Sequence, residues 1–337
     1  MILGAISGRT DHGRHARDAG GIGYLLADRY LIEHVEIVDA MPVATETSTG
    51  LLPTEAEAAS SYVSAVSAQI SPTTVPTQEE ETSAETVTAD DWNYQSDDLS
   101  ISIKKVTTGS GNNTVTYFVA DVVISDATQL SSAFAKNSFG RNVIQYTSQI
   151  AENTDAIFAI NGDYYGFRSD GIVIRNGVIY RDIPARIGLA FYTDGSMKIY
   201  DETQTTAQEL LDEGVWNTLS FGPALIQNSI VASNLSYVEV DTNFGNHSIQ
   251  GANPRTGVGM IDENHFVFIV VDGRSPGYSR GVTLTQFAQI FKDLGCTAAY
   301  NLDGGGSSEM YFMGRVVNNP LGQNKERGTS DILYIAS

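Results

Sequence analysis

The sequence is organised around the stretch Asn301-Leu302-Asp303-Gly304-Gly305-Gly306-Ser307-Ser308-Glu309. This stretch follows the apolar segment 297–300 and sets small residues between two carboxylates. Consecutive glycines carry a high entropy cost, so a stable fold keeps them mainly where φ must be positive or where a ligand approaches bare peptide N–H groups. The natural ligand of such a segment is an anion. A tight turn between two strands is the simpler explanation of an isolated Gly-Gly-Gly.

Three further polar clusters lie at the ends of apolar segments in the same way. They are Asn161-Gly162-Asp163 after the segment 156–160, Asp272-Gly273-Arg274 after the segment 265–271, and Asn253-Pro254-Arg255 just before the segment 257–261. A solvated turn explains each cluster when it is taken alone. Four clusters at strand ends together predict a site assembled from those ends.

These motifs, in this order, resemble the phosphodiester glycosidase family. The resemblance runs from about residue 100 to residue 335 and rests on A-I-N-G-D-Y-Y (159–165), S-F-G-P-A-L (220–225), N-P-R-T-G-V-G (253–259), V-V-D-G-R (270–274) and N-L-D-G-G-G-S-S (301–308). Where relatives carry Gly-Phe-Phe, this chain carries Tyr164 and Tyr165. The resemblance implies a glycoside hydrolase that cleaves the anomeric bond of a sugar 1-phosphodiester, such as N-acetylglucosamine-1-phosphodiester. Its expected partner is a cell-surface or extracellular glycan, an exopolysaccharide or a wall polymer, with no nucleic acid and no other protein.

The chemistry of this reaction indicates which residues to expect at the site. A phosphate monoester leaves easily, so the site must mainly hold the diester anion and supply carboxylates to an oxocarbenium-like transition state. Asp163, Asp303 and Glu309 are the expected catalytic carboxylates. An arginine offers a bidentate fork to phosphate, and the N–H groups of 304–307 can form an anion-binding nest. The expected substrate-binding and phosphate-binding residues are Asn161, Tyr164, Arg255, Asp272, Arg274, Asn301, Gly304, Gly305, Gly306, Ser307 and Ser308, with Arg327 as a further candidate.

No cofactor is expected to be required for this chemistry, although the plentiful carboxylates leave room for a structural calcium ion. A metal-dependent phosphodiesterase stays open as an alternative, with Asp163, Asp272 and Asp303 sharing a divalent cation. Only two histidines, His247 and His265, fall in the predicted domain to assist it. A non-catalytic glycan-binding module is the third function, with tyrosines as sugar platforms: Tyr164, Tyr165 and Tyr278.

Composition divides the 337 residues into three parts. Residues 1–40 have no assigned role. Residues 41–91 hold nine acidic residues, no lysine or arginine and one aromatic, so we expect a disordered acidic linker, with a helix at 54–69 as the alternative. Residues 92–337 form the predicted glycosidase domain. The net charge of −20 argues against nucleic acid, because phosphate backbones are bound by clustered cations.

The expected location is extracellular or in the cell envelope, because members of the family usually carry an export signal or a membrane anchor. Residues 1–40 nevertheless contain no apolar run of suitable length for either. The single cysteine, Cys296, excludes an intramolecular disulfide and is expected to pack at the end of a helix.

The predicted fold class is α+β (mixed α/β), a strand-rich sheet domain with hairpins and a few packed helices. Paired strands are expected at 101–106 and 115–125, with further hairpins at 172–180 about Asn176-Gly177, a type I′ signal, and at 188–200 about Asp194-Gly195. Helices are expected at 142–153, 205–213 and 283–294. The last has a capping box and an apolar face. The box is Thr283 with Gln286, and the face is Leu284, Phe287, Ala288, Phe291 and Leu294.

Overall fold

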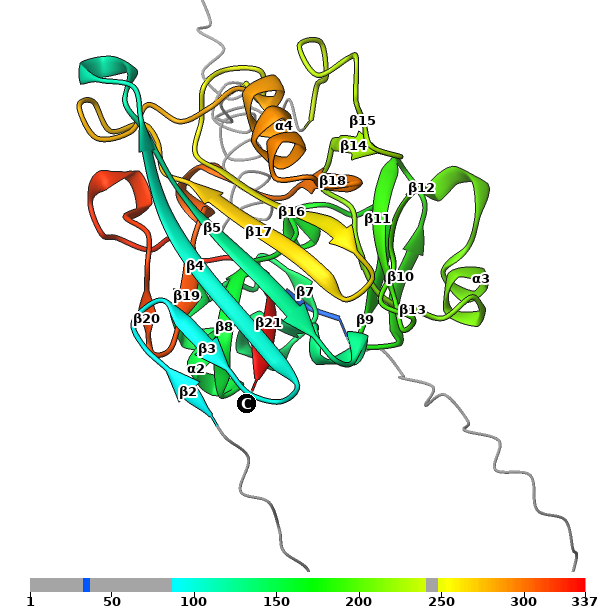
Figure 1. Cartoon of the computed structure of the whole chain (residues 1–337). Coiled ribbons are helices and arrows are strands. Elements are labelled where there is room, and N and C mark those ends of the chain that lie inside the picture. The colour runs from blue at the N-terminus through cyan, green and yellow to red at the C-terminus, as the bar shows by residue number, and fades with distance from the viewer. Residues whose placement is uncertain (1–32, 37–86, 241–247, 337) are drawn as a thin grey trace, which may run out of the picture.

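The computed structural model describes residues 33–36, 87–240 and 248–336. Most of the amino-terminal segment predicted at 1–40, most of the linker predicted at 41–91, the alternative helix at 54–69, and His247 lie outside the described residues. The described residues form several antiparallel sheets and three α-helices, which confirms the strand-rich α+β class (Figure 1).

The largest sheet has nine strands in the order β15-β14-β18-β16-β17-β5-β4-β3-β2. Its bounds are β2 (Thr88–Ala89), β3 (Asn93–Gln95), β4 (Leu99–Thr108), β5 (Val115–Ile124), β14 (Ala224–Gln227), β15 (Ile230–Val231), β16 (Arg255–Asp262), β17 (His265–Val271) and β18 (Ala298–Asn301). A second sheet has five strands in the order β20-β19-β8-β21-β6. Its bounds are β6 (Ser131–Phe134), β8 (Ala156–Asn161), β19 (Met310–Phe312), β20 (Arg315–Val316) and β21 (Asp331–Ala336).

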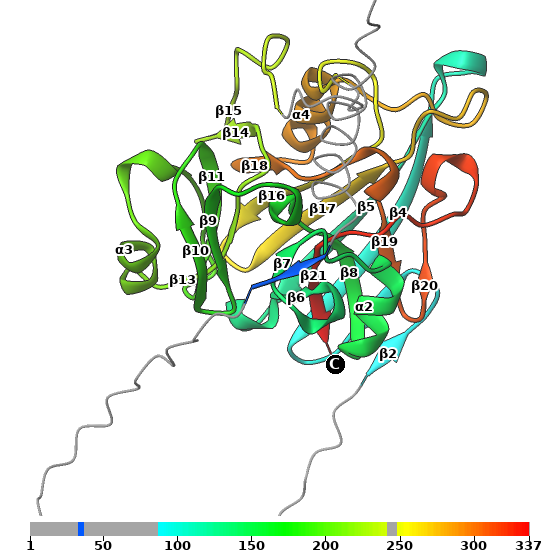
Figure 2. The ribbon, with the colours of Figure 1, turned by 180° about the vertical axis from the view of Figure 1, so that it is seen from behind.

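The main hydrophobic core joins the nine-stranded and five-stranded sheets. Buried side chains of both sheets form one cluster, in which the rings of Phe158 and Phe268 lie 5.1 Å apart. The two views agree on this arrangement: β8 and β21 lie behind β4 and β5 in Figure 1 and come forward in Figure 2. Alternating apolar residues along the strands explain the packing, because one face of each strand is directed to the shared core.

Smaller sheets complete the domain. Three strands pair in the order β12-β11-β13, two more form the hairpin β10-β9, and β1 pairs with β7. Their bounds are β1 (His34–Val35), β7 (Gly140–Arg141), β9 (Gly171–Arg175), β10 (Val178–Ile183), β11 (Ile187–Tyr192), β12 (Met197–Asp201) and β13 (Val215–Leu219). Short 3-10 turns connect several strands: Gly111–Asn113, Ala127–Gln129, Ala135–Asn137, Tyr165–Phe167, Glu202–Gln204, Gly305–Ser307 and Pro320–Gly322.

The helices cover the outer faces of the sheets. Helix α2 (Thr147–Asn153) packs on the five-stranded sheet, α3 (Ala207–Asp212) packs beside β9, β10 and β13, and α4 (Leu284–Asp293) covers the nine-stranded sheet. Thr283 caps α4 through the predicted capping box with Gln286. The predicted face of α4 is buried except at Leu294, which is 39% exposed because the helix has already ended there. Cys296 is buried just beyond, as predicted.

The predicted hairpins are present. Strands β4 and β5 pair in register from Thr108 opposite Val115, and β9 and β10 turn through Asn176 and Gly177, both at positive φ as a type I′ turn requires. Helix α2 begins later than predicted, because the residues before it are not helical: Asn142 has a φ of 58° and Gln145 forms a bridge with Thr329. No helix among the described residues is long and apolar enough to cross a membrane.

Candidate active site

Antiparallel pairing brings three of the four polar clusters together at the same end of three neighbouring strands in the large sheet. Strand β16 lies between β17 and β18 and runs opposite to both, with Arg255 opposite Val271 and Gly257 opposite Asn301. The start of β16 and the ends of β17 and β18 therefore meet, although they are far apart in sequence. Arg255 is the first residue of β16.

Asn161, the last residue of β8, joins the fourth cluster to this edge. Its Nδ2 donates to the carbonyl oxygen of Asp303 at 2.8 Å. Its Oδ1 accepts from Thr256 Oγ1 at 2.7 Å and from the N–H of Glu309 at 3.2 Å. Since these bonds use both ends of a fully buried amide, Asn161 positions the loop and does not line the cavity.

A cavity of about 330 Å³ lies where these segments meet. It combines cationic, aromatic and glycine-rich walls, and Asp303 is the only carboxylate among its described lining residues. The lining includes Arg255, Arg274, Arg327, Asp303, Gly304, Gly305, Tyr164, Phe167 and Phe221. The structure thus brings together six of the predicted site residues, together with the further candidate Arg327.

Arg255 and Arg274 line the cavity without a carboxylate partner. Within the described part of the chain, no Asp or Glu oxygen lies within 4.0 Å of either guanidinium. Arg255 is 4% exposed and donates to the carbonyl oxygens of Val282 and Gly251, at 3.1 and 2.9 Å. Burial, with Arg274 nearby, lowers the pKa of Arg255 to about 10, so it remains cationic at neutral pH. Two such cations favour an anionic ligand.

Arg327 is the third cation and the one that faces Asp303. Its Nη2 lies 3.7 Å from Asp303 Oδ2 and donates to Ser307 Oγ at 2.6 Å. Burial raises the pKa of Asp303, and the charge of Arg327 opposes that rise. This carboxyl is therefore held in the cavity wall next to a guanidinium.

The glycine loop turns tightly against the arginines. Gly305 has a φ of 71°, and a Cβ there would lie 3.3 Å from Arg274 Nη1. The N–H of Gly305 donates to Pro254 O at 3.1 Å and the N–H of Ser307 donates to Gly304 O at 3.4 Å. Two of the four N–H groups in the predicted nest are therefore already engaged within the protein, and of the three glycines Gly304 and Gly305 line the cavity whereas Gly306 is buried and does not.

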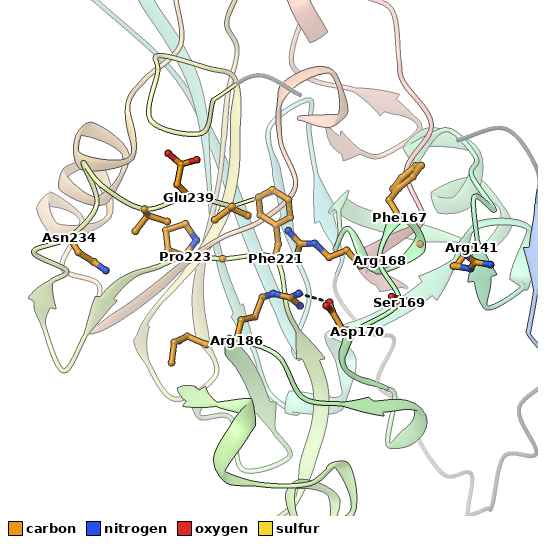
Figure 3. Close-up of a pocket in the computed structure, with 15 residues that line it drawn as sticks. Arg141, Phe167, Arg168, Ser169, Asp170, Arg186, Phe221, Pro223, Asn234 and Glu239 are labelled. Atoms are coloured by element: carbon orange, nitrogen blue, oxygen red, sulfur yellow. Dashed lines mark hydrogen bonds and ion pairs between the residues drawn. The ribbon is translucent and has the colours of Figure 1, made fainter. Parts of the chain in front are cut away.

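A second cavity, of about 700 Å³, is lined by the residues drawn in Figure 3 and shares part of its lining with the first. Phe167, Phe221 and Val240 line both cavities. The guanidinium of Arg168 lies over the ring of Phe221, 5.1 Å from its centroid, and over the ring of Tyr164 at 5.2 Å. The aromatic residues between the two cavities therefore contact a cation, Arg168, on the side of the larger cavity.

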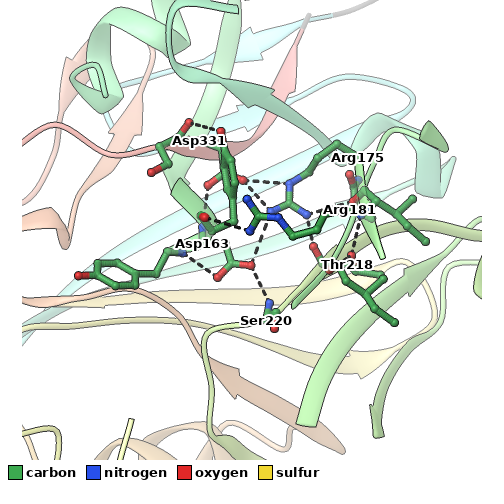
Figure 4. Close-up of polar contacts among 12 residues, drawn as sticks. Asp163, Arg175, Arg181, Thr218, Ser220 and Asp331 are labelled. Atoms are coloured by element: carbon green, nitrogen blue, oxygen red, sulfur yellow. Dashed lines mark hydrogen bonds and ion pairs between the residues drawn. The ribbon is translucent and has the colours of Figure 1, made fainter. Parts of the chain in front are cut away.

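Asp163 lies behind the cavity wall in a buried ionic network (Figure 4). Its two oxygens accept from the N–H groups of Tyr164 and Ser220, at 2.7 and 2.6 Å, and Arg175 Nη2 lies 3.6 Å away. Arg175 is paired with Asp331 at 2.8 Å. Asp163 does not line either cavity, so the structure separates it from Asp303.

Asp272 and Asn301 are also buried and used in the framework. Asp272 accepts from Asn318 Nδ2 at 2.8 Å and from the hydroxyl of Tyr278 at 2.7 Å, and burial raises its pKa. Asn301 donates to Gly222 O at 2.8 Å, and its Oδ1 is buried without a hydrogen-bond partner in the part of the chain that the structure describes. These two residues support the loops around the cavity and do not line it.

Glu309 and the two serines lie beneath the glycine loop. Glu309 Oε1 accepts from the N–H of Arg327 at 2.9 Å. Burial raises the pKa of Glu309 to about 8. Ser307 Oγ holds Arg327, whereas Ser308 is buried and its carbonyl oxygen accepts from Asn318 at 2.9 Å. Glu309 therefore holds the backbone of Arg327 in place from the buried side of the loop.

The three aspartates proposed for a shared cation do not gather. Asp163, Asp272 and Asp303 each belong to a different set of hydrogen bonds. Among residues 33–36, 87–240 and 248–336, no group of three or more His, Cys, Asp and Glu side chains is arranged to hold a metal ion. The geometry of the described residues therefore does not form the metal cluster that a two-metal phosphodiesterase needs.

Sequence reasoning did not single out Arg168, Arg175 or Asp331. Arg175 ends the apolar strand β9 and is among the largest fully buried side chains. The sequence signal for Arg175 is a charged residue at the end of the apolar run I-V-I-R. A charge that is buried with such a strand requires a partner of opposite charge. Asp331, which precedes the apolar run of β21, carries the complementary signal.

Comparisons with known proteins identify a family model and relatives that are similar to this chain. A family model described as phosphodiester glycosidase matches residues 154–336. The SPbeta prophage-derived uncharacterized protein YomE of Bacillus subtilis (strain 168) is 31% identical over 207 residues. The match covers 59% of this chain and 30% of the curated relative, so the chain spans less than a third of that protein's length.

Two solved structures have a similar fold. The catalytic domain of zebrafish N-acetylglucosamine-1-phosphodiester alpha-N-acetylglucosaminidase, auto-inhibited by its pro-peptide, superposes with a TM-score of 0.57 and 20% identity, over 75% of this chain and 88% of that chain. A hypothetical protein from Synechocystis has a TM-score of 0.54 and 14% identity, over 75% of this chain and 64% of that chain. At these identities the likeness concerns the fold alone. Because the family model covers more than half of its residues, the chain belongs to the phosphodiester glycosidase family.

Proposed function

We propose that this protein hydrolyses the anomeric bond of a sugar 1-phosphodiester. One observation supports the proposal above all. Arg255 and Arg274, two guanidinium groups without carboxylate partners among the described residues, line the same small cavity as a single carboxylate, Asp303. The two arginines suit an anionic group of the substrate, and the carboxylate suits a neighbouring carbon on which positive charge develops during the reaction. The zebrafish enzyme of similar fold is named for a reaction of this class.

In the proposed reaction, the arginines bind the phosphodiester and Asp303 lies at the anomeric carbon. The C–O bond between the sugar and the phosphate breaks, the phosphate leaves with its bonding electrons, and water supplies the new hydroxyl. Asp303 stabilises the oxocarbenium-like transition state or accepts the proton of the water. Tyr164, Phe167 and Phe221 supply an aromatic wall against which the sugar ring lies. Asp163 and Glu309 act as positioning residues.

The deciding experiment is product analysis on a methyl phosphodiester of α-N-acetylglucosamine 1-phosphate in water enriched in ¹⁸O. Cleavage at the anomeric carbon gives free sugar that carries the label, together with an unlabelled phosphomonoester. Sugar phosphate plus methanol, with the label in phosphate, would identify a phosphodiesterase and overturn the proposal. No turnover of any diester, with retained binding, would favour a glycan-binding module.

A chelation arm tests the metal-dependent alternative in the same assay. We expect exhaustive chelation to leave the turnover largely unchanged, because arginines carry the charge of the phosphate. Activity that disappears on chelation and returns with zinc or manganese, at constant circular dichroism, would support the two-metal mechanism. Rescue by calcium alone, together with recovered thermal stability, would identify a structural ion.

The proposed substrate belongs to an extracellular or cell-surface glycan, an exopolysaccharide or a wall polymer. Support comes from the family to which the chain belongs and from a cavity suited to a sugar phosphate. Separating the cells that produce the protein into medium, envelope and cytosol, followed by detection of the chain, tests this location. Recovery in the cytosol alone would contradict it.

A further inference from the structure

The larger cavity has a composition that one sugar 1-phosphodiester does not require. Its volume of about 700 Å³ is roughly twice that of the cavity that holds Asp303. Both volumes fall in the range of about 300–1,000 Å³ that is typical of ligand sites. Since Phe167 and Phe221 line both cavities, a ligand that fills the smaller one can extend along the same aromatic wall into the larger one.

Three arginines line the larger cavity: Arg141, Arg168 and Arg186. Arg186 is neutralised, because it pairs with Asp170 (Figure 3), and it also donates to Ser220 Oγ at 2.8 Å. Arg168 donates to Ser220 O at 2.8 Å but has no carboxylate within 4.0 Å in the described residues, and the same holds for Arg141. Two cations of this cavity therefore keep an unneutralised charge.

The two cavities together concentrate positive charge on an acidic protein. The chain has 20 lysine and arginine residues against 40 aspartate and glutamate residues. Among the described residues, three arginines line each cavity, whereas the lining carboxylates are Asp170 and Glu239 in the larger cavity and Asp303 in the smaller one. A local excess of cations inside an acidic surface attracts an anion to that place alone.

We propose that the larger cavity is a second anion subsite, which binds a further charged group of the same substrate. The substrate class is then an oligomer of sugar phosphates, in which one phosphodiester is cleaved while the next lies near Arg168 and Arg141. Arginine suits this task because its planar fork binds phosphate oxygens in pairs. This inference rests on the proposed function, and it adds that the enzyme recognises more than the diester it cleaves.

The test compares three substrates that share the scissile bond. The first is the methyl phosphodiester, the second is extended by a neutral sugar, and the third is extended by a sugar that carries another methyl phosphodiester. We expect kcat/KM for the third substrate to exceed that for the second by about tenfold, the factor that 1.4 kcal/mol provides. A sugar carrying a carboxylate in place of the second phosphodiester distinguishes phosphate recognition from general anion recognition.

Variants identify the residues that are responsible. Arg141→Gln and Arg168→Gln should each lower kcat/KM on the doubly charged substrate about tenfold more than on the methyl phosphodiester. Arg280→Gln is the matched control, because Arg280 is exposed and lines neither cavity. It should leave the ratio of the two rates unchanged. Thermal melts confirm that Arg168→Gln, which loses the bond to Ser220, is folded.

Two outcomes would overturn the inference. One is an equal kcat/KM for the neutral and the charged extensions. The other is a preference for the charged extension that survives in a folded double variant of Arg141 and Arg168. If no diester is cleaved at all, the proposed function fails, but the subsite is still tested by equilibrium binding of capped compounds with one and with two phosphodiesters. Tighter binding of the second compound that is lost in the double variant supports the subsite, and equal binding excludes it.

Discussion

The side-chain amide of Asn161 donates a 2.8 Å hydrogen bond to the backbone carbonyl of Asp303 and so ties the five-stranded sheet to the glycine-rich loop that begins at Asp303. The same amide accepts the N–H of Glu309, beyond the glycines. The loop is therefore held at both of its ends by one buried side chain. A flexible tri-glycine segment can present a carboxylate accurately only if such anchors offset its freedom.

The first prediction concerns this anchor. Asn161→Ala removes a donor and an acceptor from the interior and leaves Thr256 Oγ1 and the Asp303 carbonyl unpaired. We expect a loss of about 2–4 kcal/mol in the free energy of unfolding. We also expect at least a tenfold lower kcat with a smaller change in KM, because the arginines keep their own supports. Urea unfolding and steady-state kinetics measure both, and a stable variant with wild-type kcat would contradict the anchoring role.

Asp303→Asn tests the carboxylate itself. The amide keeps the shape of the side chain but cannot stabilise a developing cation, so turnover should fall by about 100-fold or more. Phosphate affinity should be retained, because Arg327 loses only a partner at 3.7 Å. The control is Asp97→Asn, an exposed aspartate outside both cavities. Wild-type turnover in Asp303→Asn would remove this residue from the mechanism.

Asp163→Asn should affect stability before chemistry. Asp163 is buried near Arg175, and its oxygens accept two backbone N–H groups. Removing one partner of a buried ionic network typically costs about 3–5 kcal/mol. We therefore expect a large fall in the melting temperature, with the remaining folded protein retaining much of its kcat. A variant with wild-type stability and no turnover would instead return Asp163 to direct catalysis.

Asp163 and Asp303 also mark the limit of what the sequence could predict. Each follows a strand that ends in asparagine, in N-G-D and N-L-D, and the local pattern is the same. Asp303 lines the cavity, whereas Asp163 lies in the interior, because Arg175 and its partner Asp331 are buried next to it. These partners come from other strands, so no short segment could distinguish the two roles.

Strand ends, hairpins and caps were predictable because their causes are local. An apolar run that stops at a polar cluster places Asn161 and Arg255 correctly, and the Asn176-Gly177 turn follows from its own residues. The convergence of the clusters depends on the sheet order, which places β16 between β17 and β18. Pairing partners of that kind are set by the whole core and not by any one segment.

The fourth prediction concerns the shape of the cation at position 255. Arg255 donates from Nε and Nη2 to three backbone carbonyls and also lines the cavity. A lysine ammonium cannot make these bonds and face a phosphate together. Arg255→Lys should therefore bind inorganic phosphate about tenfold more weakly than wild type, close to Arg255→Ala. Calorimetric titration measures this, with Arg280→Lys as the control. Wild-type affinity in Arg255→Lys would show that charge alone suffices.

The last prediction follows from the buried carboxyl of Glu309. Burial raises its pKa from the ordinary 4.5 to about 8, so the folded state holds a proton that the unfolded state releases. Its contribution to stability is complete below pH 4.5 and is lost as the pH rises to 8. Burial raises the pKa of Asp331 to about 6 as well, so the comparison with Glu309→Gln is what assigns an effect between pH 6 and 8 to Glu309. Over that interval the melting temperature of wild type should fall by several degrees more than that of Glu309→Gln, whereas the exposed control Glu263→Gln should follow wild type. Parallel curves for Glu309→Gln and wild type would show that Glu309 does not titrate in this window.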